Sequence, residues 1–438
     1  MNSHIDIQFI SKGFIKPSVP TPDHLRHYQL SYLDQIAPSS FMPMVLFYKS
    51  NLTRQELCNR FKKSLSEVLT FYYPLAGRVK SKLWVDCNDE GAFYLEADVK
   101  RKLPDVFDNL SSNEVLEKFL PPLEFGNSNG VPLAVQLTFF ECGSMAMSVK
   151  VSHEISDGLS YFMFVNAWTA VARRGAGLIK PPVLGAANFF PPKEPSSLPS
   201  NPRIVKTIVT DRFYFDAAKI AELVNKYTDN TATGVGRPSR FEALSSFIWN
   251  RFMVSTQPAK LGDDIIYTVR TGVNIRPKMQ PPLTENYFGN ISVVAVSPVP
   301  SLEANHGNYN IASSLRNAVK QINPEFVKQL RNGKTVDTLQ RMDNGKEIIP
   351  FVFTKLSRYP LHELDFGWGS PVYGGSAAFV IKNNVSFVET ETRDGIEAFV
   401  SLSEDEMAKF VADKEMIPIR STAKRGRKSE SGSILARF

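Results

Sequence analysis

A proline-rich stretch divides the 438-residue chain near its middle. Seven prolines fall between Gly175 and Pro202, with little apolar periodicity around them. Proline lacks a backbone N–H and interrupts regular elements, so this stretch predicts a long crossover between two halves. A chain of this length accommodates two or three domains. We expect an N-terminal domain over residues 1–174, a crossover linker over 175–205, a C-terminal domain over 206–420 and a basic flexible tail over 421–438.

The composition is that of an ordinary globular protein. Hydrophobic residues make up 43% and charged residues 22% of the chain, which excludes wholesale disorder. The net charge is +7, and five basic residues against one acidic residue in 421–438 supply more than half of it. The rest of the chain lacks the charge expected of a nucleic-acid-binding protein, so we expect no nucleic-acid partner. An anionic small ligand is compatible with this balance.

The cysteines and the apolar stretches indicate the cellular compartment of the protein. Cys58, Cys87 and Cys142 are few, odd in number and widely spaced, which favours a reducing compartment and disfavours a metal cluster. No stretch is apolar enough to span a bilayer, and the N-terminus does not resemble a secretory signal. We therefore expect a cytoplasmic protein without a bound metal or membrane span. We also expect a monomer.

Both halves mix strand and helix patterns. Strand-like alternation occurs at 132–140, 145–153, 265–274, 291–297, 377–381, 385–390 and 396–401. Helical periodicity occurs at 54–69, 159–174, 217–227, 240–254 and 311–322. An irregular region is expected at 323–346. The pattern predicts a mixed α/β (α+β) chain of two similar-sized domains.

A histidine motif follows one of these strands. In 145–153 the odd positions share one face, and His153 lies on that face at the end of the strand. His153-Glu-Ile-Ser-Asp157-Gly158 then leads into a helix that Asp157 or Ser156 can cap. Imidazole titrates near neutrality, so His153 is a candidate general base. The alternative is a core histidine satisfied by backbone groups, and the motif alone favours that alternative because the pattern is short and common.

A second motif, Asp365-Phe-Gly-Trp-Gly369, lies near the C-terminus. Two glycines around a tryptophan predict tight backbone geometry with a large ring packed on it. Alone, this motif predicts a structural turn.

Together, the two motifs give the chain a specific resemblance. The sequence resembles the BAHD family of plant acyl-CoA-dependent acyltransferases in the order and separation of these motifs and in chain length. Further similar segments are Leu30-Ser-Tyr-Leu-Asp-Gln35, Tyr73-Pro-Leu-Ala-Gly-Arg78, Asp86-Cys-Asn-Asp-Glu-Gly91, Asn274-Ile-Arg-Pro277 and Tyr287-Phe-Gly-Asn290. Within the family, the chain is most similar to acetyltransferases of alkaloid and terpenoid metabolism.

The resemblance implies a fold and a base. It implies two domains with mixed sheets and flanking helices, similar to chloramphenicol acetyltransferase, with a channel between them. His153 would be the general base in that channel. Asp157 would point away from the substrate, support the base and pair with Arg276. Asp365, Gly367, Trp368 and Gly369 would support the architecture away from the substrates.

The resemblance also suggests how the acyl donor is held. Ser239 and Arg240 match the position at which the family contacts the phosphates of coenzyme A, and a cation at a helix N-terminus attracts phosphate. A surface charge on Arg240 is an equal alternative. Where many members have a tryptophan before the second motif, this chain has Leu356, whose side chain donates no hydrogen bond. Thr354, Asn290 or a backbone N–H are the alternatives for the oxyanion partner or the channel.

The expected function is therefore acyl transfer. We expect an acyl-CoA-dependent O-acyltransferase, with acetyl as the acyl group, a hydroxyl of an alkaloid or terpenoid as acceptor, acyl-CoA as co-substrate and no permanently bound cofactor. One alternative is an amide-forming N-acyltransferase acting on a polyamine. The other is a catalytically impaired protein of the same fold that binds coenzyme A or a metabolite, which Leu356 favours and the intact His153 and Asp157 disfavour.

Overall fold

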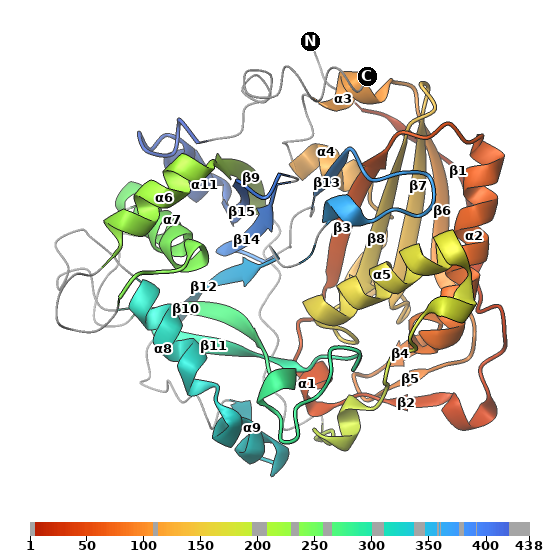
Figure 1. Ribbon diagram of the computed structural model, residues 1–438, viewed down its shortest axis with the longest axis horizontal. Coiled ribbons are helices and arrows are strands. Elements are labelled where there is room, and N and C mark those ends of the chain that lie inside the picture. The colour runs from red at the N-terminus through yellow and green to blue at the C-terminus, as the bar shows by residue number, and fades with distance from the viewer. Residues whose placement is uncertain are drawn as a thin grey trace. The chain divides into compact units, whose positions relative to one another are not determined.

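The structure divides into two compact units that interleave along the chain. The computed structural model describes residues 5–107, 113–194, 208–228, 236–256, 265–299, 311–336, 347–356, 359, 361–375, 381–390 and 392–419 (Figure 1). The first unit comprises residues 1–203, 281–292 and 360–379, and the second comprises residues 204–280, 293–359 and 380–438. The Asp365–Gly369 motif thus belongs to the first unit, which departs from the predicted C-terminal domain over 206–420.

A six-stranded mixed sheet forms the first unit. Its order is β1-β6-β7-β8-β3-β13. The strands are β1 (Ile7–Ile15), β6 (Ala92–Val99), β7 (Leu133–Phe140), β8 (Met145–Ser152), β3 (Phe41–Tyr48) and β13 (Tyr373–Gly375). β6 and β7 run parallel, and the other neighbours are antiparallel. A smaller sheet joins β2 (His27–Gln29), β5 (Trp84–Asp86) and β4 (Arg78–Lys80).

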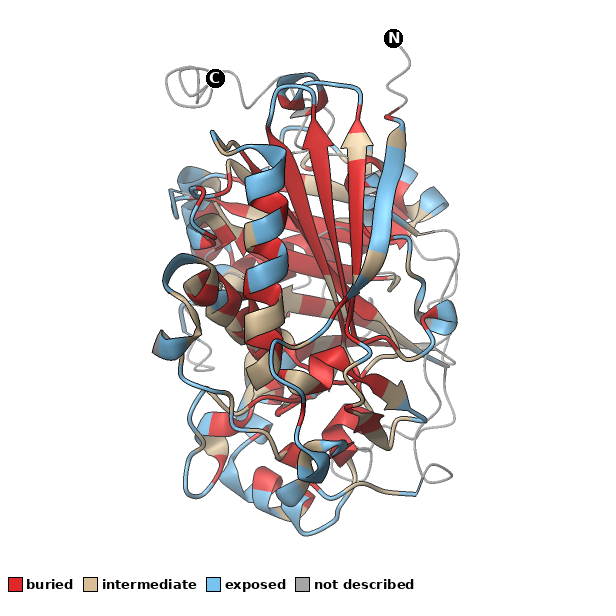
Figure 2. Ribbon diagram, turned by 90° about the vertical axis from the view of Figure 1, so that its right-hand side faces the viewer, coloured by how far each residue is buried: buried red, intermediate tan, exposed pale blue. Residues whose placement is uncertain are grey.

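Helices cover both faces of the larger sheet. α2 (Arg54–Phe71) and α5 (Gly158–Arg174) pack together across one face (Figure 1). α3 (Leu103–Phe107) and α4 (Asn113–Lys118) share a buried cluster with Phe47 and Ala146 on the other face. β8 is consequently buried on both faces rather than on the one that its alternation predicted, because it lies in the middle of the sheet. Figure 2 shows this contrast between the buried central strands and the exposed edge strand β1.

The second unit contains another six-stranded sheet, ordered β11-β10-β12-β14-β15-β9. Its strands are β11 (Ser292–Pro298), β10 (Ile265–Asn274), β12 (Glu347–Lys355), β14 (Asn384–Glu389), β15 (Ile396–Ser403) and β9 (Ile208–Phe215). Its helices are α6 (Ala217–Lys226), α7 (Arg240–Thr256), α8 (Ala312–Gln321), α9 (Pro324–Arg331) and α11 (Glu404–Val411). The aromatic rings of α7, β10 and β12 meet in the core, with Trp249 packed edge-on against Phe351 at 5.3 Å.

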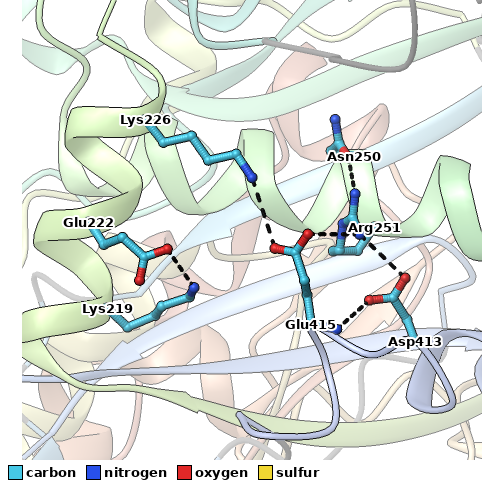
Figure 3. Close-up of polar contacts among 7 residues, drawn as sticks. All are labelled: Lys219, Glu222, Lys226, Asn250, Arg251, Asp413 and Glu415. Atoms are coloured by element: carbon cyan, nitrogen blue, oxygen red, sulfur yellow. Dashed lines mark hydrogen bonds and ion pairs between the residues drawn. The ribbon is translucent and has the colours of Figure 1, made fainter.

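An ionic cluster attaches the end of the described chain to this unit. Arg251 on α7 lies 3.5 Å from Asp413 and 3.1 Å from Glu415, and Lys226 of α6 lies 3.9 Å from the other oxygen of Glu415 (Figure 3). Arg251 also donates to the Asn250 side chain at 2.6 Å. The residues after α11 are thereby held against two helices.

Most predicted elements form within one or two residues of the predicted bounds. The exceptions are informative. Residues 324–331, expected to be irregular, form α9, because Asn323 caps the helix and Pro324 occupies its first position. The strand predicted at 377–381 falls mainly on residues outside the described ones, as does the tail 421–438. Within the described residues, no helix combines the length and apolarity that crossing a bilayer requires.

Candidate active site

His153 stands at the point where β8 ends and the chain turns into α5. The residue is partly buried. Hydrogen bonds hold its backbone on both sides. The His153 backbone N–H donates to the Ser40 carbonyl at 2.9 Å. Its carbonyl oxygen accepts from the Asn290 side-chain amide at 2.8 Å. The residue predicted to be the base is therefore held by hydrogen bonds on both sides of its Cα.

The hydrogen bond to the His153 carbonyl comes from the segment 289–291, which is far from His153 in sequence. Gly289, Asn290 and Ile291 lie in the segment 281–292 of the first unit, although the residues before 281 and after 292 belong to the second. The Ser160 hydroxyl donates to the Gly289 carbonyl at 2.8 Å and accepts from the Gly289 N–H at 3.1 Å. The Ile291 N–H donates to the Asp157 carboxylate at 3.1 Å. Three consecutive residues thus bind both ends of the turn from His153 to Asp157 and the first turn of α5.

Asp157 is a buried structural carboxylate. Of the two residues that could cap α5, the structure selects Asp157, whose Oδ1 accepts from the Ser160 N–H at 2.9 Å. Its Oδ2 accepts from Ile291, so the two oxygens join the start of α5 to the 289–291 segment. A carboxylate at a helix N-terminus is also favoured by the helix dipole. These contacts suit a residue that supports the base.

The surroundings of His153 disfavour protonation of its ring. Burial lowers the pKa of His153 from its usual value, while the Asp157 charge and the Asn290 side chain oppose that shift. Nδ1 is buried and has no hydrogen-bond partner among the described residues. A neutral imidazole at neutral pH can accept a proton, which is the property that a general base requires.

Asn290 has no amide hydrogen left for a substrate. Its Nδ2 donates to His153 and, at 2.9 Å, to Asp34. A side-chain amide carries only two N–H hydrogens, and these two hydrogen bonds use both of them. This geometry favours a positioning role for Asn290 over the predicted role as an oxyanion donor.

The Asp365–Gly369 motif forms a tight turn in the first unit. Asp365 accepts from the N–H groups of Gly367 at 2.7 Å and Gly369 at 3.0 Å, and both glycines have positive φ. The ring of Trp368 is buried and stacks on that of Phe366 at 5.3 Å. Phe366 in turn packs edge-on against Trp168 of α5. The turn is anchored to the helix that follows His153, as a supporting element would be.

Four predicted site residues lie in the second unit: Arg276, Thr354, Ser239 and Arg240. Arg276 is fully buried and donates from Nη1 to the Asn274 side chain at 3.2 Å. Its predicted ion pair with Asp157 joins residues of different units and stays a prediction. Thr354 is a partly buried residue of β12, paired with Ser386 of β14. Leu356 follows β12, and its N–H donates to the Phe387 carbonyl at 2.9 Å.

Ser239 and Arg240 begin α7. The Ser239 hydroxyl accepts from the Glu242 N–H at 3.2 Å, and the Glu242 carboxylate accepts from the Ser239 N–H at 2.7 Å, which makes a capping box. Arg240 lies 3.6 Å from the carboxylate of Glu389. The predicted contact with phosphates would compete with these local partners, and it stays a prediction.

Five residues that contact the candidate site were not singled out by sequence reasoning. They are Asp34, Ser40, Ser160, Gly289 and Ile291. Asp34 was quoted only as part of a similar segment, although Ser31-x-x-Asp34 is a capping-box pattern that marks a helix start. The backbone contacts of Gly289 and Ile291 leave no signal in their side chains.

Comparisons with known proteins match nearly the whole chain. A model of the Transferase family matches residues 5–417. The chain is 35% identical to stemmadenine O-acetyltransferase of Catharanthus roseus over 93% of this chain and 96% of that protein. It is 34% identical to vinorine synthase of Rauvolfia serpentina over 91% of this chain and 94% of that protein.

Solved structures agree with the fold. The crystal structure of vinorine synthase matches with a TM-score of 0.78 and 31% identity, covering 95% of this chain and 99% of that one. F. graminearum TRI101, solved with coenzyme A and deoxynivalenol, matches with a TM-score of 0.69 at 16% identity, covering 91% and 99%, and supports the fold alone. The chain belongs to this transferase family, the BAHD acyltransferases. It is an acyltransferase, and its two mixed sheets with flanking helices have the predicted fold class.

Proposed function

We propose that this protein is an acyl-CoA-dependent O-acyltransferase that moves an acetyl group to a hydroxyl of an alkaloid or terpenoid. The named relatives support this proposal, since they include O-acetyltransferases of stemmadenine and of limonoids. The observation that carries it is the position of His153 at the end of β8, with its backbone held by hydrogen bonds to Ser40 and Asn290. An enzyme that transfers an acyl group to an alcohol needs a base of this kind.

The proposed reaction is a direct transfer. Since Nδ1 is buried, His153 would accept the hydroxyl proton at Nε2 as the acceptor oxygen attacks the thioester carbonyl. The tetrahedral oxyanion collapses, the C–S bond breaks, and the imidazolium returns the proton to the departing thiolate. The products are the ester and free coenzyme A, so no acyl-enzyme is needed. Holding both substrates beside one base supplies much of the acceleration.

The other residues have supporting roles in this proposal. Asp157 holds the turn after His153 and would pair with Arg276. Ser239 and Arg240 would contact the phosphates of coenzyme A. Thr354 or a backbone N–H would donate to the oxyanion, because the side chain of Leu356 cannot.

The proposed setting is a reducing cytoplasm. Cys58 and Cys87 are buried free thiols and Cys142 is an exposed one, which suits such a compartment. We propose a monomer whose partners are acyl-CoA and a small hydroxylated acceptor.

A donor and acceptor screen tests the proposal. The purified protein is incubated with acetyl-CoA and hydroxylated alkaloids or terpenoids, with spermidine in a parallel series. Thiol release is followed together with mass spectrometry of new esters or amides. We expect acetyl esters from wild type and none from His153→Ala. New products confined to the spermidine series would favour N-acylation, and binding of acetyl-CoA without thiol release would contradict the proposal.

A further inference from the structure

We propose that Asp34 is a positioning residue for the base: its carboxylate orients the Asn290 amide that holds the His153 backbone. This inference rests on the proposed function of His153. It concerns a residue of α1 (Tyr32–Gln35), which is more than one hundred positions before the base in sequence.

The two carboxylate oxygens of Asp34 accept hydrogen bonds from two different residues. Oδ2 accepts from the Ser31 N–H at 2.8 Å and from the Ser31 hydroxyl at 2.6 Å. Oδ1 accepts from the Asn290 N–H at 2.8 Å and from Asn290 Nδ2 at 2.9 Å. One oxygen therefore fixes the start of α1, and the other is committed to Asn290.

The contact with Asn290 fixes the direction of an amide. Because Oδ1 binds both the main-chain and the side-chain N–H of Asn290, the side chain is closed into a ring and cannot rotate freely. With one Nδ2 hydrogen on Asp34, the planar geometry of the amide directs the other to the His153 carbonyl, 2.8 Å away. Asp34 thus determines which group Asn290 binds.

The carboxylate is specialised for this arrangement. Asp34 is 1% exposed, and its four donors are all uncharged groups of Ser31 and Asn290. Burying a carboxylate without a neighbouring cation costs free energy. A neutral polar side chain at position 34 could hydrogen-bond the N-terminus of α1 without that cost, so capping this four-residue helix does not by itself require an aspartate. Only an acceptor with two oxygens receives all four of these donors.

The consequence for the base follows from its position. His153 is held at its N–H by Ser40 and at its carbonyl by Asn290. Loss of the second contact frees the peptide that follows the base, and a displacement of about 1 Å at a reacting group costs on the order of 100-fold in rate. We expect a loss in kcat rather than a weaker affinity for acyl-CoA.

Three variants test this role in the full-length protein. Asp34→Ala removes both functions of the carboxylate. Asn290→Ala removes the contact with His153 and leaves the Ser31 cap. Ser31→Ala weakens the cap and leaves the contacts between Asp34 and Asn290, so it is the matched control. Each is assayed for kcat, KM for acetyl-CoA and melting temperature, beside wild type and His153→Ala.

The expected pattern separates positioning from folding. Asp34→Ala and Asn290→Ala should each lower kcat by about 10-fold to 100-fold, with KM within about threefold, and the double variant should be no worse than the poorer single one. Ser31→Ala should melt earlier yet keep kcat within about threefold. If Asn290→Ala or folded Asp34→Ala kept wild-type kcat, or if Ser31→Ala lost as much as Asp34→Ala, the proposal would be overturned.

A second readout does not require turnover. The rate at which diethyl pyrocarbonate modifies His153, read by peptide mass spectrometry, reports the environment of the ring. It should change several-fold in Asp34→Ala and Asn290→Ala but not in Ser31→Ala, and equal rates in all four proteins would overturn the proposal. Activity in His153→Ala would instead overturn the proposed function, so the two failures are distinguishable.

Discussion

Replacing Asp157 by alanine should damage both the stability of the first unit and the activity of the protein. The substitution removes the cap of α5, which is worth about 1 kcal/mol in typical helices. It also leaves the buried N–H of Ile291 without the carboxylate, at a cost of about 1–3 kcal/mol. These two contacts alone predict a loss of about 2–4 kcal/mol in the free energy of unfolding.

The loss of activity should exceed what unfolding explains. The turn from His153 to Asp157 and the 289–291 segment hold each other, so releasing one end loosens the base at the other. We expect kcat to fall by about 100-fold or more at temperatures where the variant is still folded, because a misplaced base loses its alignment. Urea unfolding, melting temperature and turnover of the same preparations measure the two effects separately.

A matched control exists in the second unit. Asp216 caps α6 by accepting from the Lys219 N–H at 2.7 Å, in an exposed position. Asp216→Ala should cost about 1 kcal/mol and leave kcat unchanged. If Asp157→Ala unfolded with the wild-type free energy and the geometry around His153 were unaltered, our account of Asp157 would be refuted.

Four further predictions concern His153 and the packing of the first unit. His153→Ala should lower turnover by at least about 100-fold while the melting temperature changes little, and activity within a few fold of wild type would exclude the general-base role. Because burial lowers the pKa of His153, kcat/KM should be flat near neutrality and fall only as the pH drops below the ordinary histidine value; an acidic limb above pH 7 would contradict this. Protonation of the buried ring favours the unfolded state, so stability should decrease over the same acidic range in wild type more than in His153→Ala. A Cβ at Gly77 would lie 2.4 Å from the Asp86 carbonyl oxygen, so Gly77→Ala should lower the melting temperature by several degrees, whereas Gly13→Ala, with open space around it, should not; equal melting temperatures would show that the backbone yields.

The sequence predicted the helices and strands whose bounds depend on residues close together in the chain. The helix at 158–174 is specified by Asp157 at its start, two arginines in its last turn and Gly175 at its end, and it forms as expected. The strand before His153 was evident from its alternation. Caps and periodicities act over a few residues, so they are readable without knowledge of the fold.

The surroundings of His153 could not be predicted from such local patterns. Asp34, His153 and Asn290 are joined by hydrogen bonds across separations of 256 and 137 residues. Their meeting depends on the order of strands in a sheet and on the return of residues 281–292 to the first unit. No local pattern encodes such a return.

The second motif illustrates the same division. Its glycines and tryptophan predicted a tight turn, which Asp365 forms by accepting from two N–H groups within four residues. Its assignment to the first unit was decided by contacts with distant residues, including the pairing of β13 with β3 and the packing of Phe366 on Trp168. Turn geometry is fixed by local sterics and hydrogen bonds, whereas the unit to which a turn belongs is fixed by the burial of its apolar rings, and only the folded chain provides the surface that buries them.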